Sequence, residues 1–106
     1  MNATNPGKVA NATNVPERDL AAMRVEIDSL DNALIELLDQ RMKVCREIGQ
    51  YKIEHNIGVV QSDRFSEILQ KRSRQGAERG MDPQFIKDVF TNIHDESCRQ
   101  QEALKK

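Results

Sequence analysis

Aromatic residues are scarce in this chain, which has no Trp, one Tyr and three Phe among its 106 residues. A core built from this sequence must therefore consist mainly of Leu, Ile, Val and Met side chains. Proline is scarce as well, because only Pro83 lies beyond the first sixteen residues. Few helix-breaking prolines and few β-favouring aromatics together predict an all-α protein. At 106 residues, the chain is one domain or part of one.

An excess of basic charge is also missing, since 16 Lys and Arg stand against 17 Asp and Glu, for a net charge of −1. Proteins that bind nucleic acids normally carry a markedly basic face, so no nucleic-acid partner is expected. No run approaches the ~18 apolar residues needed to span a bilayer. The N-terminus has no apolar stretch of the signal-peptide type. We therefore expect a cytoplasmic protein with no membrane partner.

Metal-ligand spacings and catalytic motifs are absent from the sequence. Cys45 and Cys98 are far apart, and neither His55 nor His94 has a Cys or another His at ligand spacing. Both cysteines fall in helical patterns, which predicts two buried, reduced thiols. The chain has no Ser-His-Asp set, phosphate-binding loop or HExxH motif. We expect no metal and no cofactor.

The first sixteen residues are rich in Asn, Ala and Thr, and Asn-Ala-Thr-Asn occurs twice in them. Such a segment has little to bury, so residues 1–16 are predicted to be a disordered tail or the remnant of a linker. Residues 17–106 then form the folded domain. A linker-like tail leaves open an origin in a larger fusion protein.

Residues 16–55 are predicted to form one long helix that begins at Pro16 and ends near His55 to Gly58. Apolar residues recur there at spacings of three and four over some nine turns, which is the helical period. These positions are Leu20, Met23, Ile27, Leu30, Leu34, Leu37, Leu38, Val44, Cys45, Ile48 and Tyr51.

Two further helices are predicted after the long one. Gln61 or Ser62 caps a short helix, which leads into a loop at residues 75–80. Asp82 is the expected N-cap of the third helix, with Pro83 at its first position. The apolar stripe of the third helix continues to Leu104. The predicted order is therefore long, short and medium.

The length of the first helix indicates a homodimer. About 40 residues span ~60 Å at 1.5 Å per residue. A compact chain of this size has a radius of gyration of only ~13 Å. The two remaining helices are too short to cover the whole apolar stripe, so a second copy is its simplest partner. A plain coiled coil is the alternative, although polar residues on the stripe argue against a regular heptad seam.

Three cations lie on or beside this stripe. Arg41 and Lys52 are eleven residues apart and point within about 20° of one another, ~16 Å apart along the axis. Their long side chains can converge on one ligand. Arg24 lies ~25 Å from Arg41 along the helix, too far to reach the same small ligand within one chain. In an antiparallel dimer, Arg24 enters the site of the other subunit.

The candidate site suits a small dianion, because Arg binds carboxylates in a planar, bidentate manner and the set has no evident nucleophile or general base. Each residue alone is an ordinary surface or interface residue, and the set as a whole carries the interpretation. Ser97 and Gln101 are four apart and share a face of the third helix. The set is Arg41, Lys52, Gln61, Arg64, Ser97 and Gln101, with Arg24 from the partner.

At these residues the chain resembles a known family, the all-helical, AroQ-type chorismate mutases. The resemblance covers about residues 20–104. It rests on MRVEIDSLDNALIELLDQR at 23–41, on Gly-Gln-Tyr-Lys at 49–52, on Arg64 and on DESCRQQ at 95–101. These segments occur in the family's order and without apparent insertions.

The resemblance implies an intertwined homodimer of three-helix chains that rearranges chorismate to prephenate without a cofactor, in the shikimate pathway to Phe and Tyr. By matching positions, Arg41 and the partner's Arg24 bind the two carboxylates. Lys52 and Gln101 donate hydrogen bonds to the ether oxygen, and Arg41, Lys52 and Gln101 are the expected catalytic residues. Arg64 and Ser97 help to position the substrate.

The chain departs from the family pattern at the start of the second helix. The family often has Asp three residues before the Arg of that helix and Glu directly after it, whereas this chain has Gln61 and Phe65. That Glu usually receives the substrate hydroxyl, which here needs another partner, with Gln61 or its backbone as candidates. Two alternatives remain open: an isochorismate pyruvate-lyase of the same fold, and a regulatory or dimerisation module of a shikimate-pathway fusion enzyme.

Overall fold

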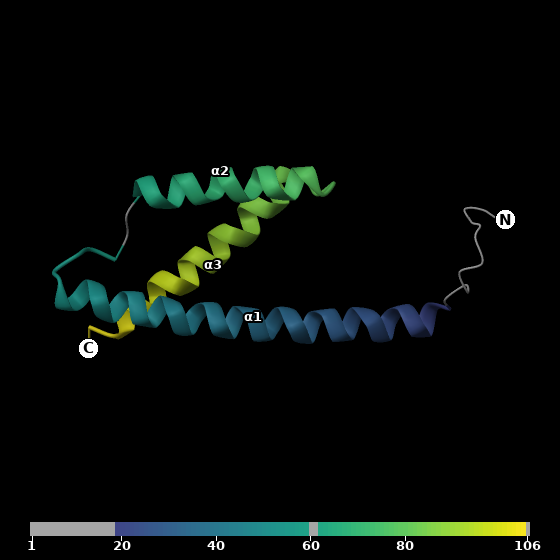
Figure 1. Ribbon diagram of the computed structural model, residues 1–106, viewed down its shortest axis with the longest axis horizontal. Helices are drawn as coiled ribbons and strands as arrows, with labels where there is room; N and C mark the ends of the chain where they lie inside the picture. Colours follow the sequence, from purple (N-terminus) through teal and green to yellow (C-terminus); the bar gives the residue numbers. More distant parts are fainter. Residues whose placement is uncertain (1–18, 60–61, 106) are drawn as a thin grey trace. The chain divides into compact units, whose positions relative to one another are not determined.

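Three α-helices make up the computed structural model, which describes residues 19–59 and 62–105 (Figure 1). They are α1 (Leu20–Glu54), α2 (Ser62–Glu78) and α3 (Pro83–Ala103). No strand occurs among these residues, so the all-α class and the order of long, short and medium helices are confirmed. In the same part of the chain, no helix is long and apolar enough to cross a membrane. The predicted tail at 1–16 and Gln61 lie outside the described residues.

Both ends of α1 are set by local hydrogen bonds. The helix begins at Leu20 and not at Pro16 as predicted, because the Asp19 carboxylate accepts a hydrogen bond from the Ala22 amide at 2.8 Å and so caps the first turn. The predicted end is confirmed. Asn56 adopts a left-handed φ of 55°, and the Ile57 amide donates to the Lys52 carbonyl at 2.8 Å. This is the hydrogen bond of a Schellman C-cap.

The boundary between α2 and α3 corrects one prediction. A loop was expected at residues 75–80, but α2 continues to Glu78. Gly76 lies inside the helix. A Cβ at this position would stand 2.4 Å from Ile86 Cγ1, so a glycine is needed here for α2 and α3 to pack closely. Gly80, with φ of 83°, makes the turn. Asp82 then caps α3 by accepting from the Gln84 amide, and Pro83 occupies the first turn, as predicted.

The chain divides into two compact units, Met1–Glu36 and Leu37–Lys106. The described part of the first unit is the N-terminal portion of α1, in which every residue from Leu20 to Glu36 is exposed. Its large apolar side chains are highly exposed, with Leu30 at 58% and Leu34 at 54% exposure. Leu20, Met23, Ile27, Leu30 and Leu34 follow one another at the helical spacing of three and four.

The second unit contains α2, α3 and the C-terminal portion of α1. Figure 1 shows α3 leading from the end of α2 to the last turns of α1. Gly49 permits the close contact of α1 with α3, since a Cβ there would lie 2.8 Å from Gln101 Cγ and 3.0 Å from Leu104 Cδ1. Buried apolar residues are few in the described chain, namely Met42, Cys45, Val59 and Ile86.

Candidate functional site

A pocket of about 360 Å³ opens between the three helices of the second unit. Its α3 residues are spaced by three and four, as are its α1 residues, so each helix presents one face to it. The lining residues are Arg41, Cys45, Ile48, Lys52, Val59, Arg64, Phe65, Ile68, His94, Ser97, Cys98 and Gln101.

Five of the seven predicted site residues therefore lie on one pocket: Arg41, Lys52, Arg64, Ser97 and Gln101. Arg24 is not among the lining residues and belongs to the first unit. Gln61, the seventh, lies outside the described residues.

Arg41 is held at the pocket by contacts on α1 and α3. Its Nη1 donates to Ser97 Oγ at 3.3 Å and approaches Cys45 Sγ at 3.7 Å. Ser97 is buried, and its hydroxyl donates to the Ile93 carbonyl at 2.9 Å. A guanidinium has five N–H donors, and these two contacts involve only Nη1, so Arg41 retains donors for an anionic ligand.

Gln101 and Lys52 each use one donor within the protein and keep others. The buried Gln101 amide donates to the Cys45 carbonyl at 2.9 Å, which leaves the second N–H of its amide nitrogen. The Lys52 ammonium donates to the Val59 carbonyl at 2.8 Å, which leaves two N–H groups. Both side chains are thus oriented by one hydrogen bond and able to make another.

The charges on the pocket have one sign. Arg41, Lys52 and Arg64 line it, whereas no Asp or Glu is among the lining residues that the structure describes. Arg64 makes an exposed ion pair with Glu67 at 3.1 Å, which contributes little in water. A pocket with cations on two helices and no lining carboxylate suits a small ligand with two negative charges.

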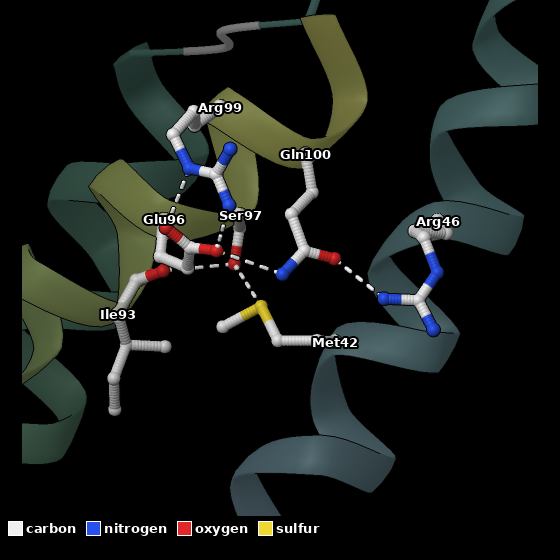
Figure 2. A network of polar contacts seen from close by, with 7 residues as sticks. All are labelled: Met42, Arg46, Ile93, Glu96, Ser97, Arg99 and Gln100. Atoms are coloured by element: carbon white, nitrogen blue, oxygen red, sulfur yellow. Dashed lines mark hydrogen bonds and ion pairs between the residues drawn. The ribbon is translucent and has the colours of Figure 1, made fainter. Parts of the chain in front are cut away.

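A polar network beside the pocket joins α3 to α1 (Figure 2). The Gln100 amide donates to Glu96 Oε2 at 2.8 Å, and its carbonyl oxygen accepts from Arg46 on α1. Arg99 forms a paired contact with the same carboxylate, at 2.8 and 2.6 Å. Hydrogen bonds from Arg99 and Gln100 lower the pKa of Glu96 to about 2. The network lies on the turns that carry Ser97 and Gln101.

Sequence reasoning missed His94 and both cysteines as pocket residues. His94 stacks on Phe65 of α2, with ring centroids 3.8 Å apart and planes at 19°. Its Nε2 lies 3.5 Å from Cys98 Sγ. Both thiols are free, but only Cys45 is buried, so the prediction of two buried thiols is wrong for the half-buried Cys98. Burial, followed by the charge of Asp95, raises the Cys98 pKa.

The one signal that could have found His94 is its position on α3, three residues before Ser97 and seven before Gln101. That spacing places all three on one helical face.

Residues 23–102 match the family model of chorismate mutase type II, which therefore covers most of the chain. The chain is 32% identical over 80 residues to a 4-amino-4-deoxychorismate mutase of Streptomyces pristinaespiralis, covering 76% of this chain and 62% of that protein. It is 28% identical over 88 residues to the protein of the same name from Streptomyces venezuelae, covering 83% and 85%.

A further relative is the bifunctional chorismate mutase/prephenate dehydratase of Escherichia coli K12, 31% identical over 88 residues. The match covers 83% of this chain but only 23% of that longer protein. This chain thus corresponds to one segment of a larger enzyme in that relative, and to less than two thirds of the first Streptomyces protein.

Proposed function

Because the chain belongs to the chorismate mutase type II family, we propose that it rearranges chorismate to prephenate in the synthesis of Phe and Tyr. The observation that carries the proposal is the pocket itself. Arg41, Lys52 and Gln101 line it together, each with donors to spare, and no carboxylate is among its described lining residues. That set matches a substrate with two carboxylates and an ether oxygen.

The proposed mechanism needs no nucleophile. As the C–O bond of the ether breaks, negative charge develops on the ether oxygen, and the Lys52 ammonium and the second Gln101 N–H stabilise it. Donors aimed at charge that grows in the transition state accelerate the step more than they strengthen substrate binding. Arg41 holds one carboxylate and, with Arg64 and Ser97, keeps the flexible ether in its reactive, folded shape.

The second carboxylate is assigned to Arg24 of another copy. Arg24 lies on the helix portion whose apolar residues are all exposed, and a homodimer through that face gives them a partner. In this proposal each site is completed by the other chain. Gln61, three residues before Arg64 in the sequence, remains a proposed binding residue.

Domain organisation is a further part of the proposal. Residues 17–106 form the mutase domain and 1–16 a tail or linker. Mutase domains joined to a prephenate dehydratase occur among the relatives, which supports an association of this domain with another enzyme of the pathway.

A second candidate reaction is the same rearrangement of 4-amino-4-deoxychorismate, in which an amino group replaces the ring hydroxyl. It is favoured by one observation, the names of the two Streptomyces relatives. The pocket requirements are identical except at the ring substituent, so the two candidates differ only at the wall that contacts the ring.

The deciding experiment follows the loss of chorismate absorbance with purified protein and identifies the product as prephenate after acid conversion to phenylpyruvate. Parallel reactions contain 4-amino-4-deoxychorismate or isochorismate. Release of salicylate from isochorismate, with no prephenate from chorismate, would replace the mutase by the pyruvate-lyase. Binding of chorismate without turnover of any of the three would leave a regulatory module.

The shared site has its own test. Arg24→Ala and Arg41→Ala chains are each expected to be inactive alone. Mixed as heterodimers, they form one site that lacks both arginines and one that is intact, so activity should reappear. Verified heterodimers without activity would refute a contribution of Arg24 across the interface.

A further inference from the structure

His94 is the one polar side chain of the pocket, apart from the two thiols, that has no part in the proposed mechanism. In that mechanism two carboxylates and an ether oxygen are bound by Arg24 of the other copy together with Arg41, Lys52, Arg64, Ser97 and Gln101. The ring of the substrate, with its single polar substituent, is the part that has no assigned contact in this mechanism. His94 comes from the pocket face of α3, one turn before Ser97, and borders α2. It is therefore available for the ring substituent.

The imidazole is held in a defined orientation. It lies nearly parallel to the Phe65 ring, at a centroid distance of 3.8 Å, and its Nε2 is 3.5 Å from the Cys98 thiol. Its other nitrogen, Nδ1, has no hydrogen-bond partner in the part of the chain that the structure describes. One ring nitrogen is thus left for a ligand, on a side chain whose position is fixed by two neighbours.

The chemistry of an imidazole nitrogen discriminates between the two candidate substituents. A neutral imidazole presents either a donor or an acceptor at Nδ1, depending on the tautomer. A hydroxyl both donates and accepts, so it pairs with either tautomer. An ammonium group only donates, and pairs with one tautomer alone. The cations Arg41, Lys52 and Arg64 on the same pocket add repulsion against an ammonium and none against a hydroxyl.

Phe65 strengthens this discrimination. The residue after Arg64 offers the pocket an apolar ring, where a carboxylate would attract an ammonium group. The nearby Cys98 carries no charge that replaces it, because burial raises its pKa and keeps it a thiol. Around Phe65 and Ile68, therefore, His94 supplies the polar contact, and no carboxylate is among the described lining residues.

We propose that His94, stacked on Phe65, is the specificity-determining residue for the ring substituent and selects a hydroxyl over an amino group. The proposal rests on the proposed mutase reaction and assigns chorismate as the substrate in preference to 4-amino-4-deoxychorismate. It replaces the sequence-based suggestion of Gln61 as the partner of the hydroxyl.

The test compares kcat/KM for chorismate and for 4-amino-4-deoxychorismate in the wild type, His94→Leu and His94→Asn. The wild type should prefer chorismate by about tenfold or more, the scale of one hydrogen bond and one unfavourable charge contact. His94→Leu should lose about tenfold with chorismate and much less with the amino compound, so that the ratio approaches one. His94→Asn, which keeps a donor and an acceptor, should retain part of the preference.

The chain offers a matched control in His55. It stacks on Tyr51 with nearly the same geometry, 3.9 Å and 19°, but lies outside the pocket lining. His55→Leu should leave both values of kcat/KM unchanged. Phe65→Glu supplies the complementary change, and should raise turnover of the amino compound relative to chorismate.

The outcomes separate this proposal from the proposed function. Chorismate turnover that falls in Arg41→Ala, with the same substrate ratio in the wild type and in His94→Leu, refutes the role of His94 and leaves the mutase intact. A wild-type protein that prefers the amino compound refutes the selection of a hydroxyl. This result does not depend on the folding of any variant. A wild type that converts neither compound overturns both proposals.

Discussion

The two units of the chain use the same apolar period but differ in what covers it. In the second unit, Cys45 and Gly49 of α1 are buried, and α3 residues contact them. In the first unit, every described residue of α1 is exposed, including Leu30 and Leu34. An apolar stripe in a sequence therefore indicates that one face of the helix is to be buried, and does not indicate which partner buries it. The chain supplies that cover for one portion of the helix, and we assign the other to a second copy.

The largest expected effect comes from placing charges among the exposed apolar residues of the first unit. In the proposed homodimer, Leu30→Lys with Leu34→Lys removes four leucines from the two-fold interface, which costs roughly 6–12 kcal/mol at 1.5–3 kcal/mol each. We expect a monomer in light scattering at micromolar concentration and loss of mutase activity. Val25→Lys is the matched control, because Val25 is 68% exposed and lies on the opposite side of the helix. A double variant that stays dimeric would show that the stripe is not the interface.

Substitution of the pocket cations Arg41 and Lys52 tests the proposed role of the second unit. Arg41→Ala and Lys52→Ala should each lower kcat/KM on the order of 10²-fold or more, because Arg41 is the proposed carboxylate ligand and Lys52 the proposed donor to the ether oxygen. Lys43→Ala is the control on the same helix, since Lys43 pairs with Asp39 at 3.1 Å on the surface and does not line the pocket. Steady-state kinetics with chorismate measure all three. Equal effects of Lys43→Ala would mean that net charge, and not the pocket, governs the rate.

The sequence was sufficient for features that depend on local period and caps. It predicted three helices, the end of α1 and the Asp82-Pro83 start of α3, and the family resemblance is confirmed by the match over residues 23–102. It also grouped five residues into one candidate site, and all five line the same pocket: Arg41, Lys52, Arg64, Ser97 and Gln101.

Features that depend on a distant residue were wrong or missed. Gly76 was taken for a loop residue because only its contact with Ile86 explains a glycine within a helix. His94 was missed because its role depends on where Phe65 lies. The spacing of α3 places His94 on the face of Ser97 and Gln101 but does not reveal the stacking on Phe65. Contacts between helices are not encoded in a local pattern.

A smaller effect is expected at the contact that joins α1 to α3. In Gly49→Ala the new Cβ would stand 2.8 Å from Gln101 Cγ, so Gln101 must move. We expect about 1–3 kcal/mol of lost stability from overpacking, partly offset by the ~1 kcal/mol that Ala gains over Gly in a helix. Because Gln101 is a proposed transition-state donor, kcat should fall more than KM rises. Gly58→Ala, with nothing within 4 Å of its Cβ, is the control.

The smallest effect concerns the surface network of Figure 2 and appears only in acid. The pKa of Glu96 is lowered from 4.5 to about 2 by Arg99 and Gln100. A carboxylate with a lowered pKa in the folded state stabilises the fold above its unfolded pKa. That contribution decreases as the pH falls from about 4.5 and is lost below about 2.

Glu96→Gln removes this titration. The urea midpoint of the wild type should therefore fall more between pH 5 and pH 3 than that of the variant. Glu67→Gln is the control, because Glu67 also pairs with an Arg three residues away but has no Gln100 to join it to α1. Since Glu96 is on the surface, the difference should be small and should decrease with added salt. Parallel midpoints in the wild type and Glu96→Gln would mean that the network is too solvated to couple the helices.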